Sequence, residues 1–166
     1  MIMPSKKTIY DYCIGFITER IQWIRGEIDA IQSAANEETK SSAGDKHETA
    51  RAMAQLEVEM NSKQLAEAER LLEGLKKIDP EKQINHIAAG ALVETSQGQF
   101  YIATSIGKVV FGESVIFIVS SDSPIGKLLL GKKSGDSVLF NGNTIKINGV
   151  VWLILVNLLR LALVRR

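Results

Sequence analysis

Two long segments with coiled-coil spacing occupy the first half of this chain. In both segments, seam residues recur at alternating intervals of four and three, which is the spacing of a coiled-coil seam; the exception is the last step of the second segment, where a second interval of three leads from Leu75 to Ile78. The first seam is Tyr10, Ile14, Ile17, Ile21, Ile24, Ile28, Ile31 and Ala35, and the second is Ala54, Val58, Asn61, Leu65, Ala68, Leu72, Leu75 and Ile78. This spacing predicts helices over about residues 6–36 and 48–78, each of which needs a partner to cover its seam.

The residues between and after the seams indicate how they pair. A polar stretch of about a dozen residues joins the two segments, which lets the second helix fold back on the first as an antiparallel hairpin. Pro80 in "DPEK" then ends the second helix. Asn61 is the polar residue of the second seam, and two interpretations stay open: it sets the register at a cost in stability, or it lies just off the contact.

The second half of the chain has the composition of a small sheet domain. Short runs rich in Val, Ile, Phe and Tyr alternate with glycine-containing turns, which predicts antiparallel strands. In "SPIGKLLLGKKSGD", Ser123 is a candidate N-cap, Pro124 the first helical residue and Gly131 the stop of a short helix. We expect the apolar residues Pro124, Ile125 and 128–130 to lie in the core of this domain. "DSVLFNGNTIKING" predicts a β-hairpin that turns at Asn141-Gly142.

The predicted fold class is therefore α+β. Residues 1–80 form an antiparallel coiled-coil hairpin, and residues 84–148 form a small antiparallel β domain with one short helix. Residues 149–166 are an apolar tail.

Charge and cysteine content exclude several kinds of function. The chain has 20 basic and 19 acidic residues, so its total charge gives no sign of sequence-independent nucleic-acid binding. The one cysteine, Cys13, excludes an internal disulfide framework and a cysteine-based zinc site, and it is expected to be a small buried hydrophobe. The N-terminus lacks the features of a secretory signal, so we expect a cytoplasmic protein.

Two motifs follow one another along the chain, "GDKHE" at 44–48 and "SPIGKLLLGKKSGD" at 123–136. They resemble, in this order, two patterns of the bacterial Gre-type transcript cleavage factors: the tip pattern Gly-Asp-x-x-Glu and the pattern Ser-Pro-Ile-x-x-x-Leu-x-Gly-Lys-x-x-Gly-Asp. The resemblance covers about residues 6–148. It implies a coiled-coil finger followed by a domain that is FKBP-like in fold but has no isomerase site.

The resemblance also implies a role for the two acids of the first motif. Such factors insert the finger into the secondary channel of RNA polymerase, where the tip helps to hold a second Mg2+ and to orient a water, so that the polymerase cleaves its own backtracked transcript. Asp45 would hold the metal, and Glu48 would orient the water or the metal. Hard Mg2+ prefers anionic oxygen ligands, which fits this chemistry. The chain would be no enzyme by itself, and it would meet nascent RNA only within the polymerase complex.

A structural role for the same acids stays open. Asp45 followed three residues later by Glu48 is close to a capping box, and acids are favoured in the first turn of a helix. The tip also departs from the family, because Arg51 stands in place of an acid and an aromatic residue is missing. A channel-binding regulator that does not stimulate cleavage is therefore an alternative. A coiled-coil adaptor that associates with itself is another, and the sequence leaves the oligomeric state open.

The tail does not fit the resemblance. Its apolar stretch, residues 150–164, contains Asn157 and Arg160. As a helix it would span about 22 Å, whereas the hydrocarbon core of a membrane is about 30 Å thick. We therefore do not expect a membrane anchor. A last strand that continues into an apolar helix and an altered C-terminus both account for the tail.

Overall fold

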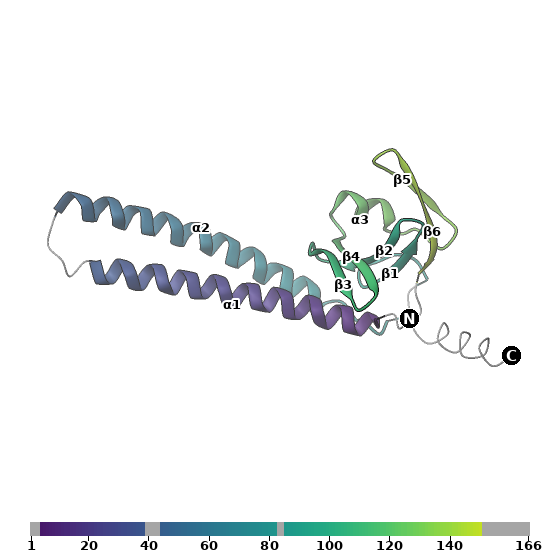
Figure 1. Ribbon diagram of the computed structural model, residues 1–166, viewed down its shortest axis with the longest axis horizontal. Coiled ribbons are helices and arrows are strands. Elements are labelled where there is room, and N and C mark those ends of the chain that lie inside the picture. The colour runs from purple at the N-terminus through teal and green to yellow at the C-terminus, as the bar shows by residue number, and fades with distance from the viewer. Residues whose placement is uncertain (1–3, 39–43, 83–84, 151–166) are drawn as a thin grey trace. The chain divides into compact units, whose positions relative to one another are not determined.

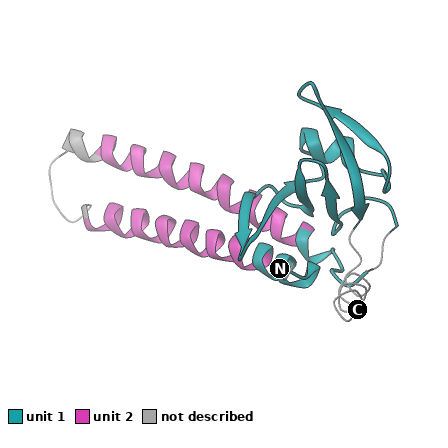
Figure 2. Ribbon diagram, turned by 45° about the vertical axis from the view of Figure 1, so that its right-hand side comes forward, with its two compact units in different colours: residues 1–13, 75–166 teal, residues 14–74 magenta. Residues whose placement is uncertain are grey.

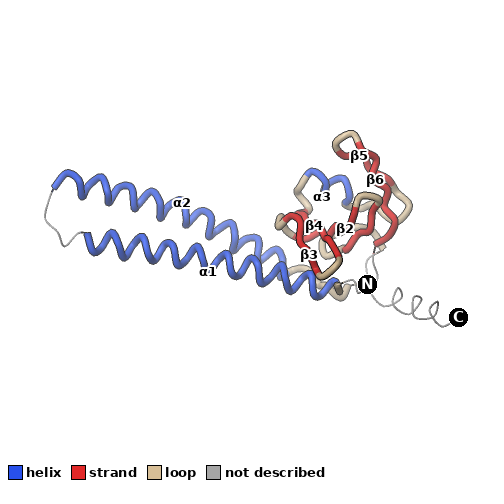
Figure 3. Tube along the Cα trace, viewed as in Figure 1, coloured by secondary structure: helices blue, strands red, loops and turns tan. Residues whose placement is uncertain are grey.

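The computed structural model of the protein describes residues 4–38, 44–82 and 85–150, with the backbone alone at residue 38 and residues 44–47 (Figure 1). Helices α1 (Lys6–Glu38) and α2 (Gly44–Lys76) come first. Strands β1 (Leu92–Thr95), β2 (Gly98–Ala103), β3 (Gly107–Phe111) and β4 (Ser114–Ser120), helix α3 (Pro124–Leu129), and strands β5 (Ser137–Phe140) and β6 (Asn143–Val150) follow (Figure 3). This order confirms the predicted α+β class, with a helical hairpin before a small sheet and one short helix. The predicted tail lies outside the described residues except for residues 149 and 150, which end β6.

The chain divides into two compact units (Figure 2). The hairpin unit is residues 14–74, and the sheet unit combines residues 1–13 with residues 75–166. The predicted boundary near residue 80 therefore differs from the observed division, in which the first thirteen residues belong with the sheet. Within the described ranges, none of the helices combines the length and the apolar content that a membrane crossing requires.

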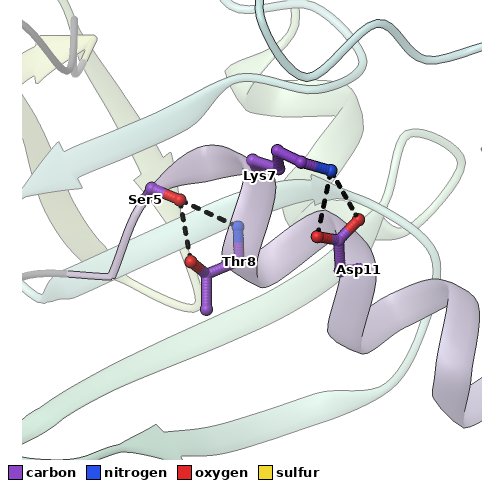
Figure 4. A network of polar contacts seen from close by, with 4 residues as sticks. All are labelled: Ser5, Lys7, Thr8 and Asp11. Carbon is purple, nitrogen blue, oxygen red and sulfur yellow. Dashed lines mark hydrogen bonds and ion pairs between the residues drawn. The ribbon is translucent and has the colours of Figure 1, made fainter.

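The start of α1 is set by a serine cap (Figure 4). The Ser5 hydroxyl oxygen accepts a hydrogen bond of 2.9 Å from the backbone N–H of Thr8, and the two hydroxyl oxygens lie 2.8 Å apart. One turn further on, the ammonium of Lys7 pairs with the carboxylate of Asp11 at 3.1 Å. A capped first turn satisfies an otherwise unpaired backbone donor, which is why the helix begins at Lys6.

The hairpin unit buries the predicted seams. Ile17, Ile21, Ile24 and Ala68 are at most 5% exposed. The remaining seam positions between residues 14 and 72 are half-buried, Asn61 included, so this asparagine lies in the contact and not outside it. α2 begins at Gly44, four residues earlier than the seam predicted, and the polar stretch between the helices shortens to residues 39–43. Those five residues lie outside the described part.

The sheet has six strands in the order β3-β4-β2-β1-β6-β5. All neighbouring strands are antiparallel except β2 and β4, which are parallel. The prediction of purely antiparallel strands is wrong at this pair. After β2 the chain passes to the edge position and forms β3, and β4 then returns into the gap between β3 and β2. The composition of a strand does not reveal which strands lie beside it, so composition alone does not predict this crossover.

Both faces of the sheet are covered. Helix α3 packs Ile125 and Leu129 into one core cluster, whose other members are Ile87, Ala91, Val93, Phe100, Ile102, Val138, Ile145 and Ile147. Side chains alternate along a strand, so the fully buried Leu92 and Tyr101 point to the other face. Ile9 and Cys13, in the first turns of α1, are also fully buried. Burial raises the pKa of the Tyr101 hydroxyl, and the nearby Cys13 adds to the shift. The first turns of α1 therefore cover this second face.

Cys13 is a core residue, as predicted, with no exposed surface. Burial raises the pKa of its thiol to about 12. The thiol is therefore protonated at neutral pH, and Cys13 acts as a small apolar side chain.

The residues around α3 that form the second motif have structural roles. The Ser123 hydroxyl oxygen accepts from the Gly126 N–H at 3.1 Å, Pro124 opens the helix, and Gly131 follows its end with a φ of +75°, as predicted. A Cβ on Gly126 would collide with the carbonyl oxygen of Ser120. The prediction of a core location holds for Ile125 and Leu129, but Pro124 is exposed, as are Leu128 (38%) and Leu130 (37%).

The β5–β6 hairpin turns at Asn141-Gly142, as predicted. Both residues have positive φ, at 49° and 77°. Such a turn matches the twist of the two strands, and it explains why an Asn-Gly pair stands here.

Candidate functional site

The two predicted site residues lie at the start of α2. Asp45 and Glu48 are the second and fifth residues of that helix. Glu48 is exposed to solvent. The side chain of Asp45 lies outside the described part, so the structure tests its place in the helix and nothing more. Two acids at this spacing on a helix can bind the same cation.

The helix start bears on the capping interpretation of the same pair. A capping box requires its first acid at the residue just before the helix. Because α2 begins at Gly44, Asp45 is already inside the first turn. The backbone therefore does not support the capping box. The favourable interaction of a first-turn acid with the helix dipole still applies to Asp45, whereas Glu48, the fifth residue, lies just beyond that turn.

A groove lies between the two helices near this end of the hairpin unit. It has a volume of about 320 Å3. Its apolar lining is Ile31, Ala35, Ala54 and Val58, and its polar lining is Gln32, Asn36, Arg51 and Gln55. The sequence reasoning missed this groove. The available signal was a pair of alanines, Ala35 and Ala54, at seam positions where larger side chains would have closed the gap between the helices.

A cross-helix ion pair identifies the side of the hairpin on which the groove opens. Arg25 on α1 and Glu69 on α2 are 2.6 Å apart, N to O. Residues seven apart on a coiled coil share a face. Gln32 follows Arg25 by seven residues, and Glu69 belongs to a series with the same spacing. We define the polar face as Arg25, Gln32, Glu48, Gln55, Ser62 and Glu69. The acid Glu48 and the groove therefore lie along one face.

The start of α2 combines carboxylate oxygens, which can bind a cation, with the guanidinium of Arg51, which can bind an anion. Mg2+ takes about six oxygen ligands, and two carboxylates supply only part of that set, so the pair fits an ion whose other ligands come from water and from a partner. Arg51, one turn after Glu48, is exposed and lines the groove. Its guanidinium matches the geometry of a phosphate. Together these groups suit a ligand that carries phosphate and metal.

Other charged residues of the hairpin contribute less. Arg25 and Arg70 pair with Glu69 and Glu67 on the surface of the hairpin, which agrees with a role in solvation. His47 and Glu38 have side chains outside the described part. Among the side chains that the structure does describe, no three of His, Cys, Asp and Glu gather around one point.

Comparisons with known proteins add little to this picture. No protein-family model and no curated protein matches the chain. A solved structure described as "Structure of the transcription factor Gfh1" is similar over 84% of this chain and 93% of its own, with 17% sequence identity and a TM-score of 0.33. A TM-score of this size carries no argument about function, so the functional argument depends on the residues of this chain.

Proposed function

We propose that this chain is an accessory factor of a bacterial RNA polymerase that enters the secondary channel with its hairpin and stimulates Mg2+-dependent cleavage of backtracked transcripts. The observation that carries the proposal is the start of α2, where Asp45 is the second residue of the helix and the exposed Glu48 is the fifth. The order of the two sequence motifs supports the same family of functions. The partner is the polymerase, and the chain acts in the cytoplasm.

The hairpin suits such a task by its dimensions. Residues 14–38 of α1 alone extend about 37 Å at about 1.5 Å per residue, and two packed helices form a rod about 20 Å wide. The role of Asp45 and Glu48 would be to bring carboxylate oxygens to a metal that another protein holds weakly. A metal bound between these oxygens and the polymerase would supply the charge stabilisation that phosphodiester hydrolysis needs.

A cleavage assay on a stalled polymerase tests the proposal. We expect Asp45→Asn and Glu48→Gln each to remove most of the stimulation, because the two oxygens act as a unit. Binding to the core polymerase and helix content should change little. The matched control is Glu57→Gln, which removes one exposed carboxylate from the same helix three turns further on and should leave cleavage unchanged.

Two results would contradict the proposal. In the first, the chain is not retained on the polymerase at all. In the second, cleavage falls in Asp45→Asn and Glu48→Gln only in proportion to a lower melting temperature, which would give the acids a purely structural role at the helix start.

A second candidate function is supported by Arg51. An exposed guanidinium within one turn of Glu48 offers a positive charge where the family pattern has an acid. Such a factor would occupy the channel, hold a phosphate and block the polymerase instead of promoting cleavage.

The variants Arg51→Glu and Arg51→Ala separate the two functions. If Arg51 causes inhibition, both variants relieve it and Arg51→Glu adds cleavage. If the factor stimulates cleavage, Arg51→Ala lowers its affinity for the stalled complex.

A further inference from the structure

The hairpin unit exposes five large apolar side chains to solvent. Trp23, Met53 and Met60 are 63–64% exposed, Leu56 is 58% exposed and Phe16 is 39% exposed. Single exposed apolar residues are common on soluble proteins, but contiguous patches are rare. The question is whether these five residues form one patch.

Their spacing along each helix is regular. Phe16 and Trp23 are seven residues apart on α1, and Met53 and Met60 are seven apart on α2, with Leu56 between them at intervals of three and four. Side chains at these intervals are neighbours on a helix surface. Each helix therefore carries one apolar strip.

Charged residues place the two strips on the same face of the hairpin. Arg20 lies three residues before Trp23, and Glu67 lies seven residues after Met60, so each belongs to one of the strips. The pKa of Glu67 is lowered first by its hydrogen bond from Arg70, and the charge of Arg20 on the other helix also contributes. Arg20 and Glu67 are thus close to each other across the hairpin. In an antiparallel pair this is the side away from Arg25–Glu69, whose ion pair marks the polar face.

We define the apolar face as Phe16, Trp23, Met53, Leu56 and Met60. The bulky residues of this face belong to different helices in the two halves of the hairpin. In the half near the joining stretch they come from α2, and α1 presents the exposed Ala30 and Ala34 there. In the other half they come from α1, and α2 continues the methionine strip as Glu67 and Gly74. A Cβ on Gly74 would meet no atom within 4 Å, so there is room above it.

This exchange makes the face complementary to itself in its outer half, near the joining stretch. A two-fold axis in the plane of the face and along the hairpin places Met53, Leu56 and Met60 of one copy over Ala30 and Ala34 of the other, with the two hairpins parallel. The same axis places Phe16 and Trp23 over Gly74 and over Glu67, whose carboxylate is paired with Arg70. Large side chains opposite small ones are the pattern of a well-packed interface. Aromatic residues and methionine are also enriched in interfaces relative to the remaining surface.

The area agrees with a dimer. If each of the five side chains has a surface of about 200 Å2, their exposed fractions leave roughly 600 Å2 of apolar surface in water on each copy. A standard interface takes about 800 Å2 from each partner, and the adjacent alanines and side-chain stems can supply the difference.

We propose that the apolar face binds a second copy of this chain, so that two hairpins associate as a four-helix dimer. The inference does not depend on the proposed function, because it uses the face opposite the groove and Glu48. It adds a regulatory consequence. A dimer doubles the width of the hairpin, so only the monomer would enter a channel that accepts two helices.

Sedimentation equilibrium of the full chain over a range of concentrations tests this proposal. We expect the wild type to be a dimer and the double variant Trp23→Glu/Met60→Glu to dissociate about a hundredfold more readily, because each buried carboxylate would lack a partner. The control is Gln22→Glu/Ser62→Glu, which adds the same charge to exposed positions on the opposite side of the same helices and should leave the dimer intact.

A second measurement follows the face directly. In the background Trp152→Phe, Trp23 is the single tryptophan of the chain. Its quenching by acrylamide should fall as the protein concentration rises and the dimer forms. Far-UV circular dichroism of both double variants checks that helix content is retained.

Three outcomes would overturn the proposal. The wild type could be a monomer at every concentration. It could associate as strongly after Trp23→Glu/Met60→Glu as before, which would locate the contact on another surface, such as the apolar tail. Trp23 could become protected only when polymerase is added, which would assign the apolar face to that protein.

Discussion

The sheet unit and the hairpin unit bury their side chains to different depths. The sheet unit covers both faces of its sheet, and Val93, Tyr101, Ile102, Leu129 and Ile147 have no exposed surface. The hairpin unit has one seam. Ile17, Ile21 and Ile24 are buried within it, but from residue 28 of α1 onwards the seam residues are only half-buried.

This difference follows from geometry. A strand in a covered sheet has neighbours on two sides and layers above and below, whereas each helix of a two-helix hairpin has one neighbour. The free energy of local opening should therefore fall from the sheet to the inner seam and then to the outer seam. The outer seam, beside Glu48 and the groove, is therefore also the part of the molecule whose seam side chains are least buried.

The largest effect is expected in the sheet unit. Leu129→Ala removes a fully buried side chain from α3 and should lower the free energy of unfolding of this unit by about 3–5 kcal/mol. Urea denaturation followed by the near-UV signal of the tyrosines of the sheet unit, Tyr10, Tyr12 and Tyr101, measures it. The control Leu139→Ala, at a side chain that is 67% exposed, should change stability by less than about 0.5 kcal/mol. Equal losses in the two variants would refute the assigned core.

A smaller effect is expected in the hairpin, and it should depend on position along the seam. Ile24→Ala removes a side chain that is 1% exposed and should cost about 3 kcal/mol. Ile31→Ala acts on a half-buried side chain at the groove and should cost about 1 kcal/mol. Hydrogen exchange of α1 amides separates the two. If Ile31→Ala proves as costly as Ile24→Ala, the seam is uniform and the gradient is wrong.

Asn61 is the polar member of the seam, and its replacement should stabilise the hairpin. Asn61→Leu places an apolar side chain at a half-buried contact and should raise the free energy of unfolding by about 1 kcal/mol. The melting temperature of the hairpin unit reports this gain. If Asn61 sets the register, the same variant should also populate more than one oligomeric form, which sedimentation velocity would resolve. A single species with higher stability would leave Asn61 without a role in the register.

The smallest effect is expected at the ion pair that marks the polar face. Arg25 and Glu69 are 2.6 Å apart, but their side chains are 60% and 45% exposed. Their coupling free energy should therefore be about 0.2–0.5 kcal/mol and should decrease with added salt. A double-mutant cycle with Arg25→Ala and Glu69→Ala measures it. A coupling that exceeds about 1.5 kcal/mol and persists in high salt would mean that the pair is shielded from water.

Patterns with a short range were predictable from the sequence. The alternation of four and three fixes which side chains of a helix face its partner, so Ile17, Ile21 and Ile24 were found before the fold was known. Ser123, Pro124 and Gly131 define the ends of α3 through local backbone geometry, and Asn141-Gly142 defines a turn in the same way.

Relationships between distant segments required the tertiary structure. The parallel pairing of β2 with β4, the first turns of α1 on the second face of the sheet, and the groove over Ala35 and Ala54 all depend on which surfaces meet. The same is true of the polar and apolar faces of the hairpin, which only a cross-helix contact such as Arg25–Glu69 can assign to the same side of both helices. Local spacing is encoded by neighbouring residues, whereas the choice among several apolar surfaces of similar energy is made by the whole chain.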